Sequence, residues 1–223
     1  MNKLGIIFDF NGTLFFDSIK HEEAWCAMAK RLRGTSLTHE ELTSKMHGRN
    51  NKKVLEMIFG HEIEEEYSTQ LSFEKEATYR QMCLDDPEHF KLVKGAVELF
   101  DQLIANNIPL SIASASIKPN IDFFVEHFHL AQWFDPNLIV YDDGTYENKI
   151  DMFKQSAKNM NLDVSDCIIV EDSVSGVEFA NAVNAKKVIV IGSKENDPKF
   201  NGQRVDAYIH DFIKFYENYI KED

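Results

Sequence analysis

The chain has 223 residues, of which 43% are hydrophobic and 27% charged, which suits a globular protein with one α/β domain and a small inserted domain. Its formal net charge of -13 argues against a nucleic-acid partner, because most of the surface would repel a phosphate backbone. No apolar run approaches the roughly 20 residues of a membrane-spanning helix, so we expect a soluble protein without a membrane partner.

Three cysteines, Cys26, Cys83 and Cys167, are odd in number and show no CxxC spacing. The N-terminus lacks the basic and then apolar pattern of a signal peptide. These features predict a cytoplasmic protein with reduced thiols, in which Cys167 is a small core residue inside a strand.

The first apolar run, residues 4–8, ends abruptly in an acid, an amide, a glycine and a threonine. A short apolar run closed by turn residues is typical of a strand covered on both faces. In open α/β sheets the ligand crevice lies beyond the carboxyl ends of the strands. We therefore expect this strand to deliver Asp9 to a crevice, where Gly12 lets the backbone approach a bound group closely.

Residues 18–88 show only helical patterns. Apolar spacing predicts helices at 19–33, 52–59 and 62–82, and the Thr38/Glu41 spacing of a capping box predicts a short helix through Met46. We therefore expect an all-helical cap domain at 18–88, inserted into a core domain formed by 1–17 and 89–223.

After residue 89 the pattern changes to alternating helices and apolar strands. Repeated βα units predict a Rossmann-like parallel sheet with right-handed crossovers and helices on both faces. The expected strands are 110–113, 138–140, 167–170, 187–191 and 207–209, and the expected helices are 95–106, 119–127, 150–160 and 176–183, with Asp211 capping a last helix.

Polar residues follow two of these strands or begin a helix. Ser114, Ala115 and Ser116 follow the strand at 110–113, where a hydroxyl and backbone N–H groups at a helix N-terminus suit a phosphate. The alternative is that Ser116 only caps the helix. Lys149 begins a helix, where it opposes the helix dipole unless a negative group holds it. The alternative there is a solvated surface lysine.

Glu171 and Asp172 end the strand at 167–170. Two adjacent carboxylates repel each other and lose solvation unless they share a cation, so they suit an ion that prefers oxygen ligands, such as Mg²⁺. The alternative is that Asp172 caps the following helix.

These segments resemble, in chain order, the four motifs of the haloacid dehalogenase (HAD) superfamily. The string D-F-N-G-T-L from Asp9 resembles the first motif, Ser114 stands at the place of the second, Lys149 with D-x-F resembles the third without its prolines, and E-D-S-V-S-G from Glu171 matches the fourth. The resemblance covers the whole chain and implies the HAD fold with an inserted helical cap.

The helical block between the first two motifs is similar to the cap of the subgroup that contains beta-phosphoglucomutase and related phosphatases. Asp17-Ser18 with His21 and Trp25, and Lys75 with Tyr79, resemble that subgroup's pattern.

The resemblance implies a role for each catalytic residue. Asp9 attacks phosphorus and forms an aspartyl-phosphate that water later cleaves. Lys149 and Mg²⁺ neutralise the repulsion between Asp9 and the phosphate oxygens, while Ser114 and the backbone N–H groups of Ala115 and Ser116 orient them.

The resemblance also implies the metal ligands. Mg²⁺ would be held by Asp9, Asp172 and the backbone carbonyl of Asn11, with Glu171 close by.

Asn11 departs from the family pattern, which usually has a second aspartate there. That aspartate protonates the leaving alkoxide and then activates water, and an amide has no titratable proton to exchange. General acid–base assistance is worth roughly 10² to 10⁴ in rate. We therefore expect a slow phosphatase, one restricted to good leaving groups, or a long-lived phosphoenzyme.

Four basic residues of the cap are candidates to reach the crevice and select the substrate: His21, Arg49, Lys52 and Lys75. The resemblance places His21 and Lys75 best. The alternative for each is a solvated charge on a helix.

We expect a monomeric, Mg²⁺-dependent phosphoric monoester hydrolase that acts on a small phosphorylated metabolite, such as a sugar phosphate. One alternative is a phosphomutase of the beta-phosphoglucomutase kind, against which Asn11 counts. A second is a phosphonate hydrolase, although Asn51 stands where that subgroup has a cap lysine. A third is a non-catalytic sensor that binds a phosphate ligand.

Overall fold

The computed structural model describes residues 3–46 and 51–221. The chain divides into two compact units. The core unit comprises Met1–Phe16 and Lys91–Asp223, and the helical unit comprises Asp17–Phe90. No helix in the described part of the chain is both long and apolar enough to span a membrane.

The core unit contains a six-stranded sheet in the order β3-β2-β1-β4-β5-β6, with every neighbouring pair parallel. This confirms the predicted parallel sheet. The strands are β1 (Gly5–Phe8), β2 (Leu110–Ile117), β3 (Val140–Asp142), β4 (Cys167–Glu171), β5 (Lys187–Ile191) and β6 (Ala207–Ile209).

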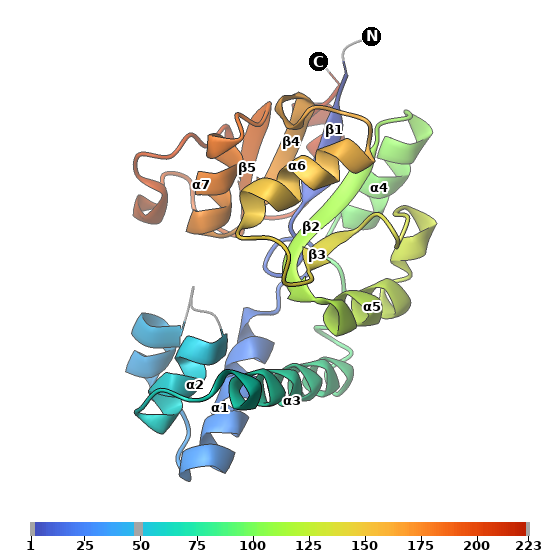
Figure 1. The fold of residues 1–223 in the computed structure, drawn as a ribbon. Helices are drawn as coiled ribbons and strands as arrows, with labels where there is room; N and C mark the ends of the chain where they lie inside the picture. The colour runs from blue at the N-terminus through green and yellow to red at the C-terminus, as the bar shows by residue number, and fades with distance from the viewer. Residues whose placement is uncertain (1–2, 47–50, 222–223) are drawn as a thin grey trace. The chain divides into compact units, whose positions relative to one another are not determined.

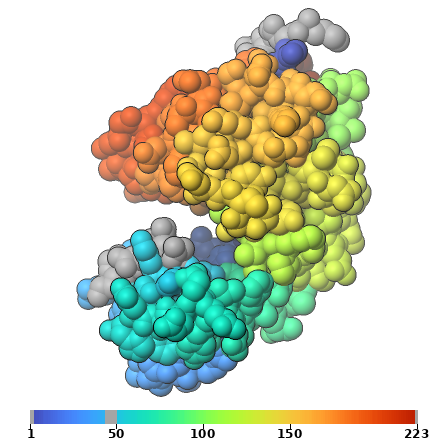
Figure 2. All heavy atoms as spheres, viewed as in Figure 1, coloured from blue at the N-terminus to red at the C-terminus, as the bar shows by residue number. Residues whose placement is uncertain are grey.

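Helices cover both faces of this sheet. Crossovers between parallel strands are right-handed. The helices that connect β1 to β2 and β2 to β3 therefore lie on one face of the sheet, and those that connect β4 to β5 lie on the other. Figure 1 shows α6 and α7 in front of the strands, and in Figure 2 the atoms of this part of the chain hide the near face of the sheet. The helices are α4 (Ala96–Ala105), α5 (Lys118–His127), α6 (Lys149–Asn159), α7 (Val174–Ala182) and α8 (Phe215–Tyr219), with short 3₁₀ turns at Leu130–Gln132, Val164–Asp166 and Pro198–Phe200.

Strand β1 is buried on both faces, which explains its uninterrupted apolar sequence. Ile7 packs in a cluster with Phe153 of α6 and Val177 of α7. Phe8 makes edge contacts on the other face with Phe100 of α4, at 5.6 Å between ring centroids, and with Phe212, at 5.8 Å. Each fully buried side chain of this kind stabilises the fold by about 1.5–3 kcal/mol.

The predicted end of β2 was wrong. The strand continues to Ile117 rather than ending at Ala113, because β3 pairs with it at Ala113, Ser114 and, after a shift in register, Ile117. Helix α5 begins at Lys118, and its N-cap residue Ile117 makes no side-chain capping bond. Ser114, Ala115 and Ser116 therefore lie in an irregular strand end, and Ser116 does not cap the helix.

The prediction for the last helix was also wrong. Helix α8 begins at Phe215 with Lys214 as its N-cap residue. Asp211 instead accepts a hydrogen bond from the backbone N–H of Ile213, at 2.9 Å, which closes a turn before the helix. Cys167 is confirmed as a buried thiol within β4.

The helical unit contains α1 (Ser18–Arg33), a π-helix (Glu41–Met46), α2 (Asn51–Phe59) and α3 (Glu65–Leu84). Residues 17–46 and 51–90 include no strand. The capping box is confirmed, since the Thr38 N–H donates to Glu41 Oε2 at 2.8 Å and the Glu41 N–H donates to Thr38 Oγ1 at 3.2 Å. The helix that follows this box is a π-helix rather than an α-helix.

Candidate active site

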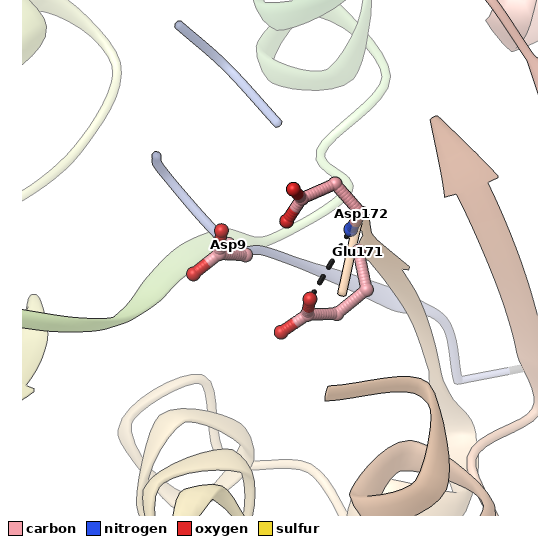
Figure 3. A group of neighbouring side chains, drawn as sticks. All are labelled: Asp9, Glu171 and Asp172. Carbon is pink, nitrogen blue, oxygen red and sulfur yellow. Dashed lines mark hydrogen bonds between the residues drawn. The ribbon is translucent and has the colours of Figure 1, made fainter. Parts of the chain in front are cut away.

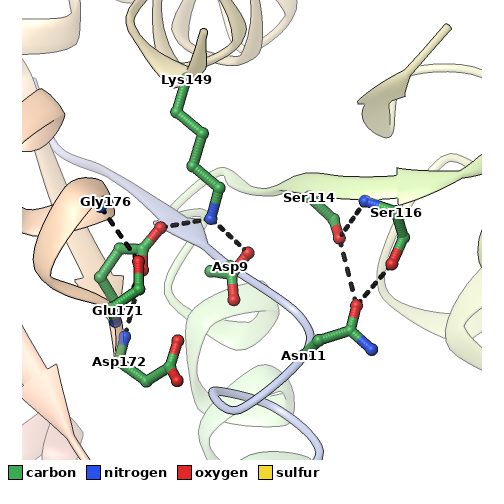
Figure 4. Close-up of polar contacts among 9 residues, drawn as sticks. Asp9, Asn11, Ser114, Ser116, Lys149, Glu171, Asp172 and Gly176 are labelled. Carbon is green, nitrogen blue, oxygen red and sulfur yellow. Dashed lines mark hydrogen bonds and ion pairs between the residues drawn. The ribbon is translucent and has the colours of Figure 1, made fainter. Parts of the chain in front are cut away.

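Asp9 follows β1 at the carboxyl edge of the sheet, and its backbone N–H donates to the carbonyl of Val170 in β4, at 3.0 Å. Its side chain is 5% exposed. Lys149 Nζ donates to Asp9 Oδ1 at 2.6 Å and also to Glu171 Oε1, as Figure 4 shows. The first, third and fourth sequence motifs therefore meet at one lysine ammonium.

Lys149 is the first residue of α6. Asn148 caps the helix by accepting a hydrogen bond from the Ile150 N–H at 2.8 Å. The lysine side chain is only 13% exposed and holds two carboxylates, so it is not a solvated surface lysine. These two anions offset the unfavourable position of a cation at a helix N-terminus.

The acidic side chains around Lys149 outnumber the positive charge that it supplies. Burial raises the pKa of Asp9 well above its ordinary value; Lys149 opposes that rise, and Glu171 and Asp172 add to it. Burial by itself would lower the pKa of Lys149, but Asp9 and Glu171 together outweigh it and raise that pKa, so the lysine stays an ammonium. One positive charge thus faces three carboxylates.

Asp9, Glu171 and Asp172 form a group that fits a divalent cation. Each offers a carboxylate oxygen, and these oxygens lie within 4.8 Å of one another (Figure 3). Oxygen donors in excess of the available positive charge suit Mg²⁺. The raised pKa of Asp9 supports this fit, since a further cation would stabilise its charged form.

Glu171 is fully buried and extensively hydrogen-bonded. Its Oε2 accepts from the N–H of Asp172 at 3.2 Å and from Ser173, through the N–H at 3.3 Å and the hydroxyl at 3.0 Å. Ser173 also caps α7 by accepting from the Gly176 N–H at 3.0 Å, so Asp172 is not the cap. Glu171 is therefore held rigidly as the second partner of Lys149.

Two glycines make room for these carboxylates. A Cβ on Gly176 would lie 2.1 Å from Glu171 Cδ, and a Cβ on Gly12 would lie 2.2 Å from Asp172 Oδ2. Gly12 also has a φ of +78°, which favours glycine. The group that lies close to the Gly12 backbone is thus the Asp172 carboxylate, whereas we expected a bound group there.

Asn11, Ser114 and Ser116 come together beside Asp9 (Figure 4). The Ser116 hydroxyl donates to Asn11 Oδ1 at 2.6 Å, and the Ser114 hydroxyl lies 3.5 Å from the same oxygen. The Ser116 N–H donates to Ser114 Oγ at 3.2 Å. Ala115, between the two serines, is exposed.

Three residues that orient the site had no role predicted from the sequence: Asn148, Ser173 and Gly176. The signal for Ser173 was present, because a serine three residues before a helical N–H is the usual spacing of an N-cap. The steric need for Gly176 could not be seen without the position of Glu171.

Two of the expected substrate-binding residues pair within the helical unit. Lys75 is 2% exposed, and its Nζ lies 2.6 Å from His21 Nδ1 and 2.9 Å from Glu76 Oε1. Burial lowers the pKa of Lys75. His21 Nε2 lies 3.2 Å from Asp17 Oδ2, and its ring stacks on Tyr79 with centroids 4.0 Å apart. Lys75 is therefore a buried, hydrogen-bonded group rather than a solvated charge.

The structure describes one of the other two expected cap residues. Lys52 makes an exposed ion pair with Glu65, at 2.5 Å. Arg49 lies outside the described residues.

A model of the haloacid dehalogenase-like hydrolase family matches residues 4–184 of the chain. The chain belongs to this family. The HAD resemblance, the fold that it implied and the assignment to a hydrolase family are thereby confirmed.

Solved structures of HAD proteins match nearly the whole chain. A HAD hydrolase of family IA, variant 3, from Entamoeba histolytica HM-1:IMSS superposes with a TM-score of 0.87 at 35% identity, covering 96% of this chain and 95% of that one. A beta-phosphoglucomutase from Clostridium difficile has a TM-score of 0.77 at 24% identity, covering 100% of this chain and 96% of that one, and shares the HAD fold.

Among curated relatives, hexitol phosphatase A of Escherichia coli (strain K12) is 24% identical over 92% of this chain and 90% of its own length. The chain spans only 27% and 35% of the length of two other curated relatives, both from Arabidopsis thaliana.

Proposed function

We propose that this HAD hydrolase is a Mg²⁺-dependent phosphatase that acts on a small phosphorylated metabolite, namely a sugar phosphate. The observation that carries the proposal is the Lys149 ammonium bound between Asp9 and Glu171 at the carboxyl edge of the sheet. A nucleophilic carboxylate next to a fixed positive charge suits attack on an anionic phosphate. The name of hexitol phosphatase A supports the substrate class.

In the proposed reaction Asp9 attacks phosphorus. An Oδ–P bond forms as the ester P–O bond breaks, and the leaving oxygen departs with the electron pair and takes a proton from solvent. Water then attacks phosphorus and gives a proton to solvent, the Oδ–P bond breaks, and inorganic phosphate and the free Asp9 carboxylate are released. Positioning and charge supply most of the catalysis, because the transition state of phosphoryl transfer is loose.

Side chains of the protein bind and orient the phosphate in this reaction. Lys149 binds the phosphate oxygens while it holds Asp9, and Glu171 keeps the ammonium in place. Asp9, Asp172 and the backbone carbonyl of Asn11 would hold Mg²⁺, which supplies positive charge against the phosphate oxygens when bound. Ser114 and Ser116 orient the phosphate and hold Asn11.

We expect the protein to release inorganic phosphate from members of a panel of sugar and polyol phosphates, and Asp9→Asn to abolish release, because an amide cannot form the phosphoenzyme. The measurement is phosphate release with Mg²⁺ and with a chelator. Asp122→Asn, which changes an exposed acid of α5, is the control and should keep full activity. Equal turnover by Asp9→Asn and the parent would refute Asp9 as nucleophile. Binding without turnover on the whole panel and on an aryl phosphate would favour the sensor.

We also expect Mg²⁺ to raise the melting temperature by about 5–10 °C at a hundredfold excess over its Kd, since binding stabilises by about 2.7 kcal/mol there and each kcal/mol shifts a domain of this size by about 2–4 °C. Asp172→Ala should remove most of the shift. The measurement is the melting temperature of the parent and of Asp172→Ala, with and without Mg²⁺. Asp143→Ala, which changes an acid in an exposed loop, is the control and should keep the shift. An undiminished shift in Asp172→Ala would show that the metal binds elsewhere.

A further inference from the structure

Four phenylalanine rings of the core unit pack together. Phe10 lies between Asp9 and Asn11 in the sequence and is fully buried. Phe10 and Phe15 contact Phe124 of α5 and Phe128, the residue that ends α5. We call these four residues the aromatic clamp.

Phe10 and Phe15 are the two ends of one tight turn. The Phe10 carbonyl accepts hydrogen bonds from the N–H groups of Thr13, Leu14 and Phe15, at 3.2, 2.8 and 3.1 Å. The Gly12 N–H donates to the Phe15 carbonyl at 2.7 Å. Asn11 lies inside this turn, so its backbone moves with the two rings.

Both ends of the turn pack on the same two rings. Phe10 stacks on Phe124 with centroids 4.2 Å apart and an interplanar angle of 18°. Phe15 meets Phe128 edge-on at 5.4 Å and Phe124 at 6.3 Å. Such arrangements are the preferred geometries of aromatic pairs, and they restrict how the turn can slide along α5.

Helix α5 begins directly after the strand end that carries Ser114 and Ser116. The turn is therefore attached at two places. The Ser116 hydroxyl of the strand end donates to Asn11 at 2.6 Å, beside Asp9. The aromatic clamp attaches the same turn to α5.

We propose that Phe124 and Phe128 are positioning residues that hold Asn11 and Ser116 in register with Asp9, an inference that rests on the proposed phosphatase function. The clamp fixes the turn from its buried side, and the Ser116 bond fixes it from the side of the reaction. Of the groups that would hold Mg²⁺, Asp172 lies between β4 and α7 beside Glu171 and Lys149, whereas the backbone carbonyl of Asn11 lies in the turn. Loosening the clamp therefore impairs phosphate positioning most and weakens metal binding only in part.

The test is Phe124→Leu, which keeps most of the buried volume and removes the stack on Phe10. Since a displacement of 1 Å can cost about a hundredfold in rate, we expect kcat for an aryl phosphate to fall by about ten- to a hundredfold. The Mg²⁺-induced shift in melting temperature should be reduced less than in Asp172→Ala, because the Asn11 carbonyl is the one proposed metal ligand inside the turn. Ser116→Ala combined with Phe124→Leu should lower kcat less than the product of the two single effects, because both changes free the same turn.

Phe215→Leu is the matched control. Phe215 is an equally buried ring, in α8, that packs on Phe212 and Tyr219 and makes no described contact with the turn. We expect Phe215→Leu to lower the melting temperature about as much as Phe124→Leu does and to leave kcat unchanged. Unchanged kcat in Phe124→Leu, or an equal loss in Phe215→Leu, would overturn the proposal. Should Phe124→Leu fail to fold, Phe128→Leu replaces it, with the same expectations.

A readout without turnover separates this inference from the proposed function. In ¹⁵N-labelled protein, the Asn11 side-chain amide signals are identified by their disappearance in Asn11→Asp. We expect Phe124→Leu to shift these signals strongly and Phe215→Leu to leave them in place. Unshifted signals in Phe124→Leu would refute the clamp even in a protein without phosphatase activity, while a parent protein that releases no phosphate would refute the function alone.

Discussion

Asn11→Asp is expected to raise kcat/KM for alkyl phosphates by about 10² to 10⁴, and to change kcat/KM for aryl phosphates far less. An alkoxide is a poor leaving group and needs a proton as the P–O bond breaks, whereas a nitrophenolate departs unaided. In the structure the Ser116 hydroxyl donates to Asn11 Oδ1 at 2.6 Å. An aspartate can accept that hydrogen bond with one oxygen and carry the titratable proton on the other.

The measurement is kcat/KM for a matched alkyl and aryl pair in the parent, Asn11→Asp and Asp9→Asn. Asp9→Asn should abolish turnover of both substrates, and Asn201→Asp, on the exposed surface, should change neither. If Asn11→Asp leaves both substrates unchanged while chemistry is rate-limiting, position 11 is not the acid–base site. If the parent is already fast on alkyl phosphates, a group other than position 11 supplies the proton.

The second large effect is expected for Lys149→Met. Turnover should fall by about 10² to 10³ or more, the usual loss when one fixed group that stabilises transition-state charge is removed. Without Mg²⁺ the free energy of unfolding should also fall, by about 3–5 kcal/mol, because Asp9 and Glu171 remain buried without their shared cation. Mg²⁺ should restore part of the stability and little of the turnover.

Denaturant unfolding with chelator and with Mg²⁺ measures the stability, and phosphate release measures the turnover. Lys118→Met is the matched control, since Lys118 pairs with Asp122 on the exposed surface and such pairs contribute little to stability. A Lys149→Met variant as stable as the parent in chelator would contradict the assigned role of Lys149 in balancing the buried carboxylates.

Local sequence pattern was enough to predict the parallel sheet and the order of the catalytic motifs along its edge. Strands such as β1 are buried on both faces, so their apolar runs are uninterrupted and recognisable from local pattern alone. Where such a run stops at a charged residue, the stop marks the strand end, and in a parallel sheet these ends share one edge. The sequence pattern alone therefore places Asp9 and Glu171 at the same edge of the sheet.

How these residues are held depends on contacts between segments that are distant in the sequence. The end of β2 depended on pairing with β3, which no local pattern of serines and alanines reveals. The bond from Ser116 to Asn11 and the stack of Phe10 on Phe124 join segments more than a hundred residues apart. Hydrogen-bond and ring geometries depend on positions within a few ångströms, whereas periodicity reports only which face of an element is buried. Motif spacing therefore predicted which groups meet at the site, and packing across distant segments determined their contacts.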